Sequence, residues 1–323
     1  MVNNDDWNDE LSKDTKQRRN NRKRRKLNAD QTHYDSESSE FVKSLESTKG
    51  TSWMAEKKYK GMFTEIEAGL SGVLGEGTYD WVDRRVFDAV FDRLTLMSLY
   101  KLMKSGIIDT LDFPIARGKE AHVFHGTGED GGPVAVKIFH TSNAVFKNLI
   151  QYIEGDPRFG GLKRRHRDLV DIWVRKEYRN LSRLKKWGLA VPKPLGVLKN
   201  VLVMEYLGTD TAPSPRLRDV RVLDPQPVYD DLIEFLAVAW QKAKMVHGDF
   251  SPYNIMWHDG RPVVIDVGQA VVQSHPRSQE FLVRDVTRLV EWANKNGLDV
   301  ELAEAMYDVL EMDLSHFDDK EEE

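Results

Sequence analysis

The fold is decided by two segments, VHGDFSPYNIMW at residues 246–257 and VVIDVGQAV at residues 263–271. In the first, Asn254 follows Asp249 by five residues, and in the second, Asp266 ends an apolar run twelve residues after Asn254. Phosphoryl transfer needs a carboxylate that orients the attacking hydroxyl, and an amide oxygen and a second carboxylate that hold magnesium against the phosphates. The spacing therefore predicts a phosphoryl-transfer site.

An aspartate at the end of a strand more often caps a turn, and Asp266 alone favours that interpretation. The order and spacing of His247, Asp249, Asn254 and Asp266 together reverse it. We therefore expect Asp249 to act on the attacking hydroxyl, and Asn254 and Asp266 to bind the metal.

A second signal lies upstream, where the apolar run VAVK ends in Lys137. Alone it is weak, because a lysine at a strand end is often only solvated. Its position, nineteen residues after Gly118 and more than a hundred before Asp249, is typical of a lysine that pairs with the α- and β-phosphates. Glu177, in RKEYRNL, is the best candidate to hold this lysine, although a solvated charge on a helix is the alternative.

The turn ARGKEAHVF lacks the usual glycine-rich phosphate loop. It contains only Gly118, followed by Lys119 and Glu120, so the pattern G-x-G-x-x-G is absent. We expect Gly118 and Lys119 to lie over the nucleotide in a stiffer lid.

Composition excludes several classes of protein. The 323 residues contain no cysteine, which excludes disulfides, thiolate metal sites and a cysteine nucleophile. No apolar run is long enough for a membrane helix, and the N-terminus MVNNDDWNDE is unlike a signal peptide, so we expect a cytoplasmic protein. The formal net charge of −5 is unevenly placed, with eight basic residues at positions 16–26 and an acidic C-terminal end.

The pattern along the chain predicts an α+β protein with a small β-rich lobe, a mostly helical lobe and helices at the N-terminus. Two short helices are expected from Asp83 to Gly106, and another from Asp168 to Trp187. Strands are expected at 107–113, 122–125, 134–139, 201–204, 254–257 and 263–266, and helical periodicity from 278 to 312. The expected segments are a disordered tail (1–52), a helical segment (53–106), an N-lobe (107–205) with a flexible insertion at about 141–170, a reduced C-lobe (206–312) and an acidic tail (313–323).

The sequence resembles the RIO family of atypical serine/threonine protein kinases, most closely its type-one branch, over roughly residues 84–300. The motifs that carry the resemblance are, in order, GKEAHVF, AVKIF, GDPRF, KEYRNL, NVLVMEYLG, HGDFSPYN, IDVGQAV and SHPRSQEFLVRD. No A-P-E motif follows Asp266, and this absence agrees with the resemblance to the RIO family. The resemblance implies a reduced two-lobed kinase fold.

The resemblance also implies roles. Asp249 becomes the catalytic base or hydroxyl-orienting group, Lys137 the phosphate lysine, and the backbone near Glu205 and Leu207 the adenine contact. ATP with Mg²⁺ or Mn²⁺ is the implied cofactor, and ATP hydrolysis is expected to pass through a phosphorylated Asp266. The implied partners are small ribosomal subunit particles and ribosomal RNA, with the basic run at 16–26 as a candidate RNA contact.

The chain departs from the family pattern at four positions. Ala116 and Arg117 stand where Ser-Thr is usual, Pro252 replaces an acid, and Gly268 replaces a common serine. None of these changes removes a candidate catalytic residue, so we expect an active enzyme.

Two other functions fit parts of the pattern. A small-molecule kinase of the aminoglycoside or choline type also uses H-G-D and a later strand-borne aspartate, but GKEAHV and KEYRNL favour RIO. A nucleotide-sensing scaffold without useful catalysis is the other alternative, and measured turnover separates it.

Overall fold

The computed structural model describes residues 68–70, 90–141, 152–153, 156, 158, 166–209 and 212–317, with only the backbone of 166–168. The chain divides into two units, Met1–Gly61 and Met62–Glu323, and every described residue belongs to the second. The predicted tail at 1–52, the helical segment before residue 90 except for residues 68–70, most of the insertion and residues 318–323 lie outside the described residues. The boundaries of the predicted segments stay predictions.

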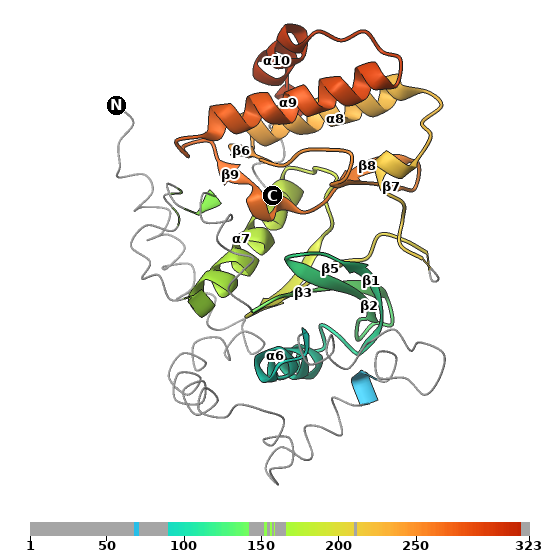
Figure 1. Cartoon of the computed structure of the whole chain (residues 1–323), viewed down its shortest axis with the longest axis vertical. Helices are drawn as coiled ribbons and strands as arrows, with labels where there is room; N and C mark the ends of the chain where they lie inside the picture. The colour runs from blue at the N-terminus through green and yellow to red at the C-terminus, as the bar shows by residue number, and fades with distance from the viewer. Residues whose placement is uncertain are drawn as a thin grey trace. The chain divides into compact units, whose positions relative to one another are not determined.

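The N-lobe is a single antiparallel sheet of five strands in the order β1-β2-β3-β5-β4 (Figure 1). Its strands are β1 (Thr110–Arg117), β2 (Ala121–Thr127), β3 (Pro133–Phe139), β4 (Pro194–Leu198) and β5 (Val201–Glu205). Short turns join β1 to β2 and β2 to β3, so these strands pair with their neighbours in sequence. The sheet presents Lys137, near the end of its central strand β3, to the rest of the site.

Strand β4 was not predicted, because Pro192 and Pro194 interrupt the strand pattern. In the structure Pro194 is the first residue of β4, and β4 lies at the edge of the sheet. Proline is tolerated at the first residue of a strand and in an edge strand, because neither position needs the N–H group that proline lacks for pairing within the sheet.

Helix α6 (Arg93–Lys104) begins and ends where the sequence gives start and stop signals. The side chain of Asp92 caps its first turn by accepting from the backbone N–H of Thr95 at 2.8 Å. Gly106 follows with a φ of 73°, a left-handed conformation that favours glycine. This confirms the second predicted helix, while the predicted start of the first lies outside the described residues.

The C-lobe is built from helices, as predicted. Helix α7 (His166–Lys186), which confirms the prediction for 168–187, packs against β4 and β5 and against the segment after Asp266. Beyond it come α8 (Pro225–Gln241), α9 (Ser278–Lys295) and α10 (Leu302–Glu311), which pack on one another. The periodicity at 278–312 is interrupted at Gly297, whose φ of 97° separates α9 from α10.

Two small ribbons lie between the sheet and the helices α8 and α9 (Figure 1). One pairs β6 (Met245–Val246) with β9 (Val271–Val272), and the other pairs β7 (Ile255–His258) with β8 (Arg261–Val264). The β7–β8 turn consists of Asp259 and Gly260, with φ values of 50° and 77°. Two successive positive φ values are the signature of a tight hairpin turn whose twist matches that of its strands.

The buried core joins the two lobes through α7. Trp173 and Val174 of α7 are buried in one hydrophobic cluster with residues of α8 and α9 such as Leu232 and Phe281. The structure thus confirms an α+β fold with a β-sheet lobe and a helical lobe. Within the described ranges, no helix is long and apolar enough to cross a membrane.

Candidate active site

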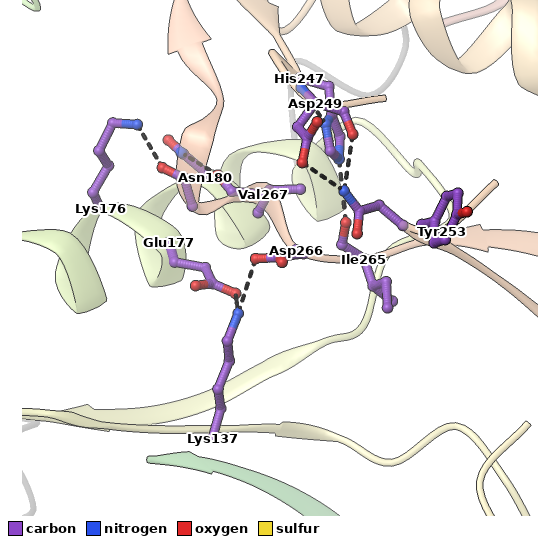
Figure 2. A network of polar contacts seen from close by, with 12 residues as sticks. Lys137, Lys176, Glu177, Asn180, His247, Asp249, Tyr253, Ile265, Asp266 and Val267 are labelled. Atoms are coloured by element: carbon purple, nitrogen blue, oxygen red, sulfur yellow. Dashed lines mark hydrogen bonds and ion pairs between the residues drawn. The ribbon is translucent and has the colours of Figure 1, made fainter. Parts of the chain in front are cut away.

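Lys137 forms the centre of a buried ion cluster that joins three elements. Its ammonium donates to Glu177 Oε1 of α7 at 2.7 Å and to Asp266 Oδ1, just after β8, at 2.9 Å. Figure 2 shows the lysine extending from the sheet toward both carboxylates. Lys137 and Glu177 are 8% and 1% exposed, whereas the side chain of Asp266 is 42% exposed. The cluster therefore brings together three of the predicted residues and leaves one carboxylate open to solvent.

The charges in this cluster shift one another's pKa values. Burial alone would lower the pKa of Lys137, but the negative charges of Asp266 and Glu177 outweigh burial and raise it. Lys137 in turn lowers the pKa of Asp266. Burial raises the pKa of Glu177, because one lysine compensates two carboxylates and Glu177 is the deeper of the two. The lysine is thus held as a cation and Asp266 as an anion.

Asp249 and Asn254 form a second group, on the loop between β6 and β7, where the sequence predicts the catalytic residues. Asn254 Nδ2 donates to the backbone oxygen of Asp249 at 2.9 Å and to its Oδ2 at 3.0 Å. The other carboxylate oxygen, Oδ1, accepts from Arg288 Nη1 of α9 at 2.6 Å. Both oxygens of Asp249 are thereby oriented, which fits a group that must hold a hydroxyl in one direction.

The β7–β8 hairpin explains the twelve-residue spacing between Asn254 and Asp266. The backbone N–H of Ile265 donates to the backbone oxygen of Asn254 at 2.9 Å, so the two metal-ligand candidates lie at the same open end of the hairpin. His247 adds a second link, since its Nε2 donates to the backbone oxygen of Ile265 at 3.2 Å while its Nδ1 accepts from the backbone N–H of Asp249 at 3.2 Å.

Helix α9 fixes the start of the loop between β6 and β7. The carboxylate of Asp285 is fully buried and accepts from the backbone N–H groups of Gly248 at 2.7 Å and Phe250 at 3.0 Å. Arg284, its neighbour, donates to the backbone oxygen of Gly248. Asp249, which lies between these anchored residues, is therefore held by the backbone on both sides.

Asp266 adopts a left-handed conformation, with φ 60° and ψ 58°. This conformation is costly for a residue other than glycine and persists only where its surroundings hold it. The 3-10 turn that follows, η7 (Val267–Gln269), is held from α7 by Lys176, whose ammonium donates to the backbone oxygens of Gly268 at 2.6 Å and Ala270 at 2.7 Å. Figure 2 shows Lys176 and Asn180 pointing at this segment.

Gly118 and Lys119 lie in the tight turn between β1 and β2. The backbone N–H of Gly118 donates to the oxygen of Ala121 at 2.9 Å, and Lys119 is exposed. The next residue, Glu120, is affected by the charges of the ion cluster: burial and then the charge of Asp266 raise the pKa of Glu120 to about 7. The turn thus adds a carboxyl group near the cluster that the sequence did not single out. Ala116 and Arg117, two of the departures, are the last residues of β1.

Glu205 and Leu207 lie on the segment that leads from β5 into the C-lobe. The side chain of Glu205 is turned to β4, where it accepts from the backbone N–H of Lys193 at 2.9 Å. The backbone oxygen of Leu207 accepts from Ser214 at 2.9 Å. Because the Glu205 side chain is used in this way, this segment can contact a ligand through its backbone groups.

The structure brings together Lys137, Glu177 and Asp266 in one group and Asp249 and Asn254 in another, linked through Ile265. Sequence reasoning missed a set of supporting residues, namely Glu120, Lys176, Asn180, Asp285 and Arg288. Four of them lie within motifs that the sequence already presented, Glu120 in GKEAHVF, Lys176 and Asn180 in KEYRNL and Asp285 in SHPRSQEFLVRD, but none was given a role, and Arg288 lies outside every motif.

A sheet lobe, a helical lobe and a lysine–glutamate–aspartate cluster beside an Asp–Asn loop define the class of the protein as kinase-like. The model of the RIO domain matches residues 122–306, more than half of the chain. The chain therefore belongs to the RIO family of serine/threonine kinases. The alternative of an aminoglycoside or choline kinase does not agree with this membership.

Relatives of the chain carry RIO names. The RIO-type serine/threonine-protein kinase Rio1 of Haloferax volcanii is 43% identical over 67% of this chain and 74% of that protein. The RIO1 kinases of Caenorhabditis elegans and Homo sapiens are 36% and 34% identical over 72% and 71% of this chain, but over only 46% and 41% of their own lengths. The chain thus spans most of the archaeal relative and less than half of these two eukaryotic ones.

Solved structures of a RIO kinase share the fold. The Rio2 kinase of Chaetomium thermophilum in its ADP/Mg²⁺-phosphoaspartate complex aligns with a TM-score of 0.52 and 17% identity over 87% of this chain and 92% of that one. Another structure of the same kinase aligns with a TM-score of 0.51 and 22% identity. These alignments agree with the two-lobed architecture.

Proposed function

We propose that the protein is an ATP- and Mg²⁺-dependent phosphotransferase of the type-one RIO branch. The observation that carries the proposal is the contact of Lys137 with both Glu177 and Asp266, at 2.7 and 2.9 Å. This arrangement pairs a phosphate-binding lysine with the carboxylate that orients it and with the metal-binding aspartate, which phosphoryl transfer needs at the same time. The relatives, which are named serine/threonine-protein kinases, support the same reaction.

The residues present fit a magnesium ion. Asn254 uses its Nδ2 on Asp249, so its carbonyl oxygen Oδ1 is the atom it offers to a cation. Asp266 uses Oδ1 on Lys137, which leaves Oδ2 for the same purpose. Mg²⁺ prefers hard oxygen ligands and commonly takes only one or two from the protein, the others being phosphate oxygens and water. When bound, it would neutralise charge that develops on the phosphates.

The nucleotide would lie between the β1–β2 turn and the C-lobe. Lys137 would pair with its α- and β-phosphates, while Gly118 and Lys119 would cover them from the turn. The adenine would meet the backbone oxygen of Glu205 and the backbone N–H of Leu207, since the Leu207 oxygen is already used by Ser214.

Asp249 would orient the acceptor hydroxyl for attack on the γ-phosphorus. A bond forms between the acceptor oxygen and phosphorus, the bond to the bridging oxygen of ADP breaks, and the hydroxyl proton passes to the Asp249 carboxylate. The transition state for this transfer is loose, so the gain comes mainly from orientation. The bonds that Asp249 accepts from Arg288 and Asn254 support that role.

We further propose that ATP hydrolysis passes through a phosphorylated Asp266. A carboxylate oxygen of Asp266 attacks the γ-phosphorus, ADP leaves, and water then cleaves the acyl phosphate to release phosphate and restore the carboxylate. The exposed fraction of Asp266 and its lowered pKa favour attack by an anion, and the related Rio2 structure is named as a phosphoaspartate complex. Chemical trapping after incubation with γ-labelled ATP should place the label on Asp266. Label found only on serine or threonine contradicts this route.

The decisive experiment is ATP turnover by Lys137→Ala and Asp249→Ala variants, with and without EDTA. Each variant should keep its fold and lose about a thousandfold or more in kcat, because both residues act on the transition state. Exhaustive EDTA treatment should abolish turnover of the unaltered chain, and added Mg²⁺ or Mn²⁺ should restore it. Near-normal turnover in either variant removes the assignment.

The partner we propose is a small ribosomal subunit particle, contacted through the basic run at residues 16–26. This run lies outside the described residues, and the proposal is supported by its eight cations and by the family resemblance. Deleting residues 1–30 should weaken binding to purified particles, flatten its salt dependence and leave basal ATP hydrolysis unchanged. If the truncated and full-length chains bind the particles equally tightly across a salt titration, the basic run does not contribute to binding. A cytoplasmic location stays a prediction.

A further inference from the structure

The segment that follows Asp266 is held by a buried amide on α7. Asn180 is fully buried, and its Nδ2 donates to the backbone oxygens of Val267 at 2.8 Å and Ala270 at 3.1 Å. These two oxygens belong to the ends of the turn η7, which begins directly after Asp266. The orientation of the Asn180 amide therefore helps to fix the backbone that directly follows Asp266.

The orientation of Asn180 is set by an arginine from the insertion between β3 and α7. Arg158 Nη1 donates to Asn180 Oδ1 at 2.9 Å. An asparagine side chain presents oxygen on one side and N–H groups on the other. A donor placed against the oxygen therefore fixes the N–H groups on the side of Val267 and Ala270.

Arg158 is itself fixed by a buried carboxylate. Asp156 is 2% exposed, and its two oxygens accept from Arg158 Nε at 3.0 and 3.1 Å and from Nη2 at 2.7 Å. Its Oδ1 also accepts from the backbone N–H of Arg158 at 3.0 Å. A guanidinium bound on two edges in this way has little freedom, so it holds Asn180 in a defined place.

The described part of the insertion is anchored in the core as well. Tyr152 is 6% exposed, and its ring lies 5.3 Å from that of Phe281 on α9 and 6.4 Å from that of Trp173 on α7. Tyr152 lies within the insertion predicted to be flexible at about 141–170, and it packs against the two helices that frame the site.

We propose that Arg158 is a positioning residue for phosphoryl transfer, which it serves by orienting Asn180 and thereby the backbone of Asp266. This rests on the proposed function, in which Asp266 binds the metal. The left-handed conformation of Asp266 needs support from its surroundings, and η7 is one of the segments that supply it. Without Arg158, the buried Asn180 oxygen loses the donor that faces it, so the amide is held less firmly against the backbone oxygens of Val267 and Ala270.

The test compares Arg158→Met, Asn180→Ala and the double variant with the unaltered chain. Methionine keeps much of the apolar length of the arginine but provides no donor. We expect Arg158→Met to lower kcat about tenfold, with a smaller change in the KM for ATP, and to raise the Mg²⁺ concentration needed for half-maximal rate. Arg158→Lys should recover part of the loss. The kcat of the double variant should be about that of the less active single variant, because both changes break the same chain of contacts.

The matched control is Arg175→Met. Arg175 lies on α7, the helix that carries Asn180, and pairs with Asp171 at 2.7 Å at the surface. Loss of this arginine should leave kcat and the Mg²⁺ requirement unchanged. Urea unfolding of all variants shows whether they are fully folded under the assay conditions. A purely structural role for Arg158 predicts reduced stability with an unchanged kcat and Mg²⁺ requirement in the folded protein, and this result overturns the proposal.

Hydrogen exchange separates this inference from the proposed function. Peptides that cover residues 263–272 should exchange faster in Arg158→Met than in the unaltered chain or in Arg175→Met, whatever the turnover. Unchanged exchange there overturns the inference even if the enzyme is active. If exchange is faster but ATP turnover does not depend on Lys137, the contacts from Arg158 to the segment after Asp266 are supported. The assigned activity is then refuted, and with it the positioning role of Arg158 in phosphoryl transfer.

Discussion

Replacement of Glu177 by glutamine tests the central ion cluster most directly. Glutamine keeps the size of the side chain and one acceptor oxygen, but it removes the charge that faces Lys137 at 2.7 Å. Asp266, at 2.9 Å, then becomes the one remaining negatively charged partner of the lysine in this cluster, so the ammonium is drawn away from the place where phosphates would meet it.

The size of the effect follows from the contact that is lost. A hydrogen bond between charged groups contributes about 1.5–3 kcal/mol, and each 1.4 kcal/mol is about a factor of ten in rate. We therefore expect kcat/KM for ATP to fall by about ten- to a hundredfold in Glu177→Gln.

Stability should respond differently. Burial raises the pKa of Glu177 above its ordinary value of 4.5, so the folded chain holds this proton more tightly than the unfolded chain does. The stability that this group contributes is then present below pH 4.5 and is lost as the pH rises through the raised pKa. Above the raised pKa the ionised glutamate gives the fold no net support, so Glu177→Gln should not lower the free energy of unfolding.

The assay pairs steady-state ATP turnover with urea unfolding at pH 7. Glu280→Gln is the control, because Glu280, in the first turn of α9, forms an exposed ion pair with Arg277, the residue before the helix. If kcat/KM of Glu177→Gln stays within about twofold of the control, Glu177 does not orient the lysine. If the variant instead loses about 3 kcal/mol or more, the typical cost of breaking a buried pair, then Asp266 does not compensate Lys137 as the structure indicates.

Two further predictions concern the residues beside this cluster. Burial lowers the pKa of Lys176 to about 7, so between pH 7 and 10.5 the unfolded chain binds the proton that the folded chain has lost. The stability of the unaltered chain relative to Lys176→Met should therefore rise from pH 7 to 9, by up to about 1.4 kcal/mol per pH unit, and parallel urea-unfolding profiles contradict this. Gly268→Ala places a Cβ 3.1 Å from Trp173 Nε1 and 3.2 Å from Glu177 Oε2, so it should cost about 1–3 kcal/mol and lower turnover. An unchanged urea midpoint speaks against this tight packing.

The sequence predicted the residues whose meaning lies in local spacing. Asp249 and Asn254 lie on one loop, and Asn254 and Asp266 are joined by one hairpin, so their distances along the chain reflect distances in space. Lys137 was recognised from its strand, and the structure confirms that it meets Glu177. The fold class followed from the same order of strands and helices.

The supporting residues were not predictable in this way. Asp285 binds backbone N–H groups some 35 residues earlier, and Lys176 binds backbone oxygens about 90 residues later. Lys176 and Asp285 lie within the motifs KEYRNL and SHPRSQEFLVRD, but their partners are backbone groups, which no residue type identifies, so the sequence does not say what they bind. Arg288 is a similar case, because one charge on an amphipathic helix looks like any other until the helix is placed beside Asp249.

The tip of the β7–β8 hairpin has a consequence for engineering this chain. Its turn residues Asp259 and Gly260 lie at the opposite end of the ribbon from the bond between Asn254 and Ile265. Two residues added at the tip extend the ladder by one pair and leave the far end in register, whereas a single added residue must be absorbed as a bulge. Insertion of an even number of residues at this tip therefore adds length away from the site, whereas an odd number twists the hairpin that carries the two oxygens proposed to bind the metal.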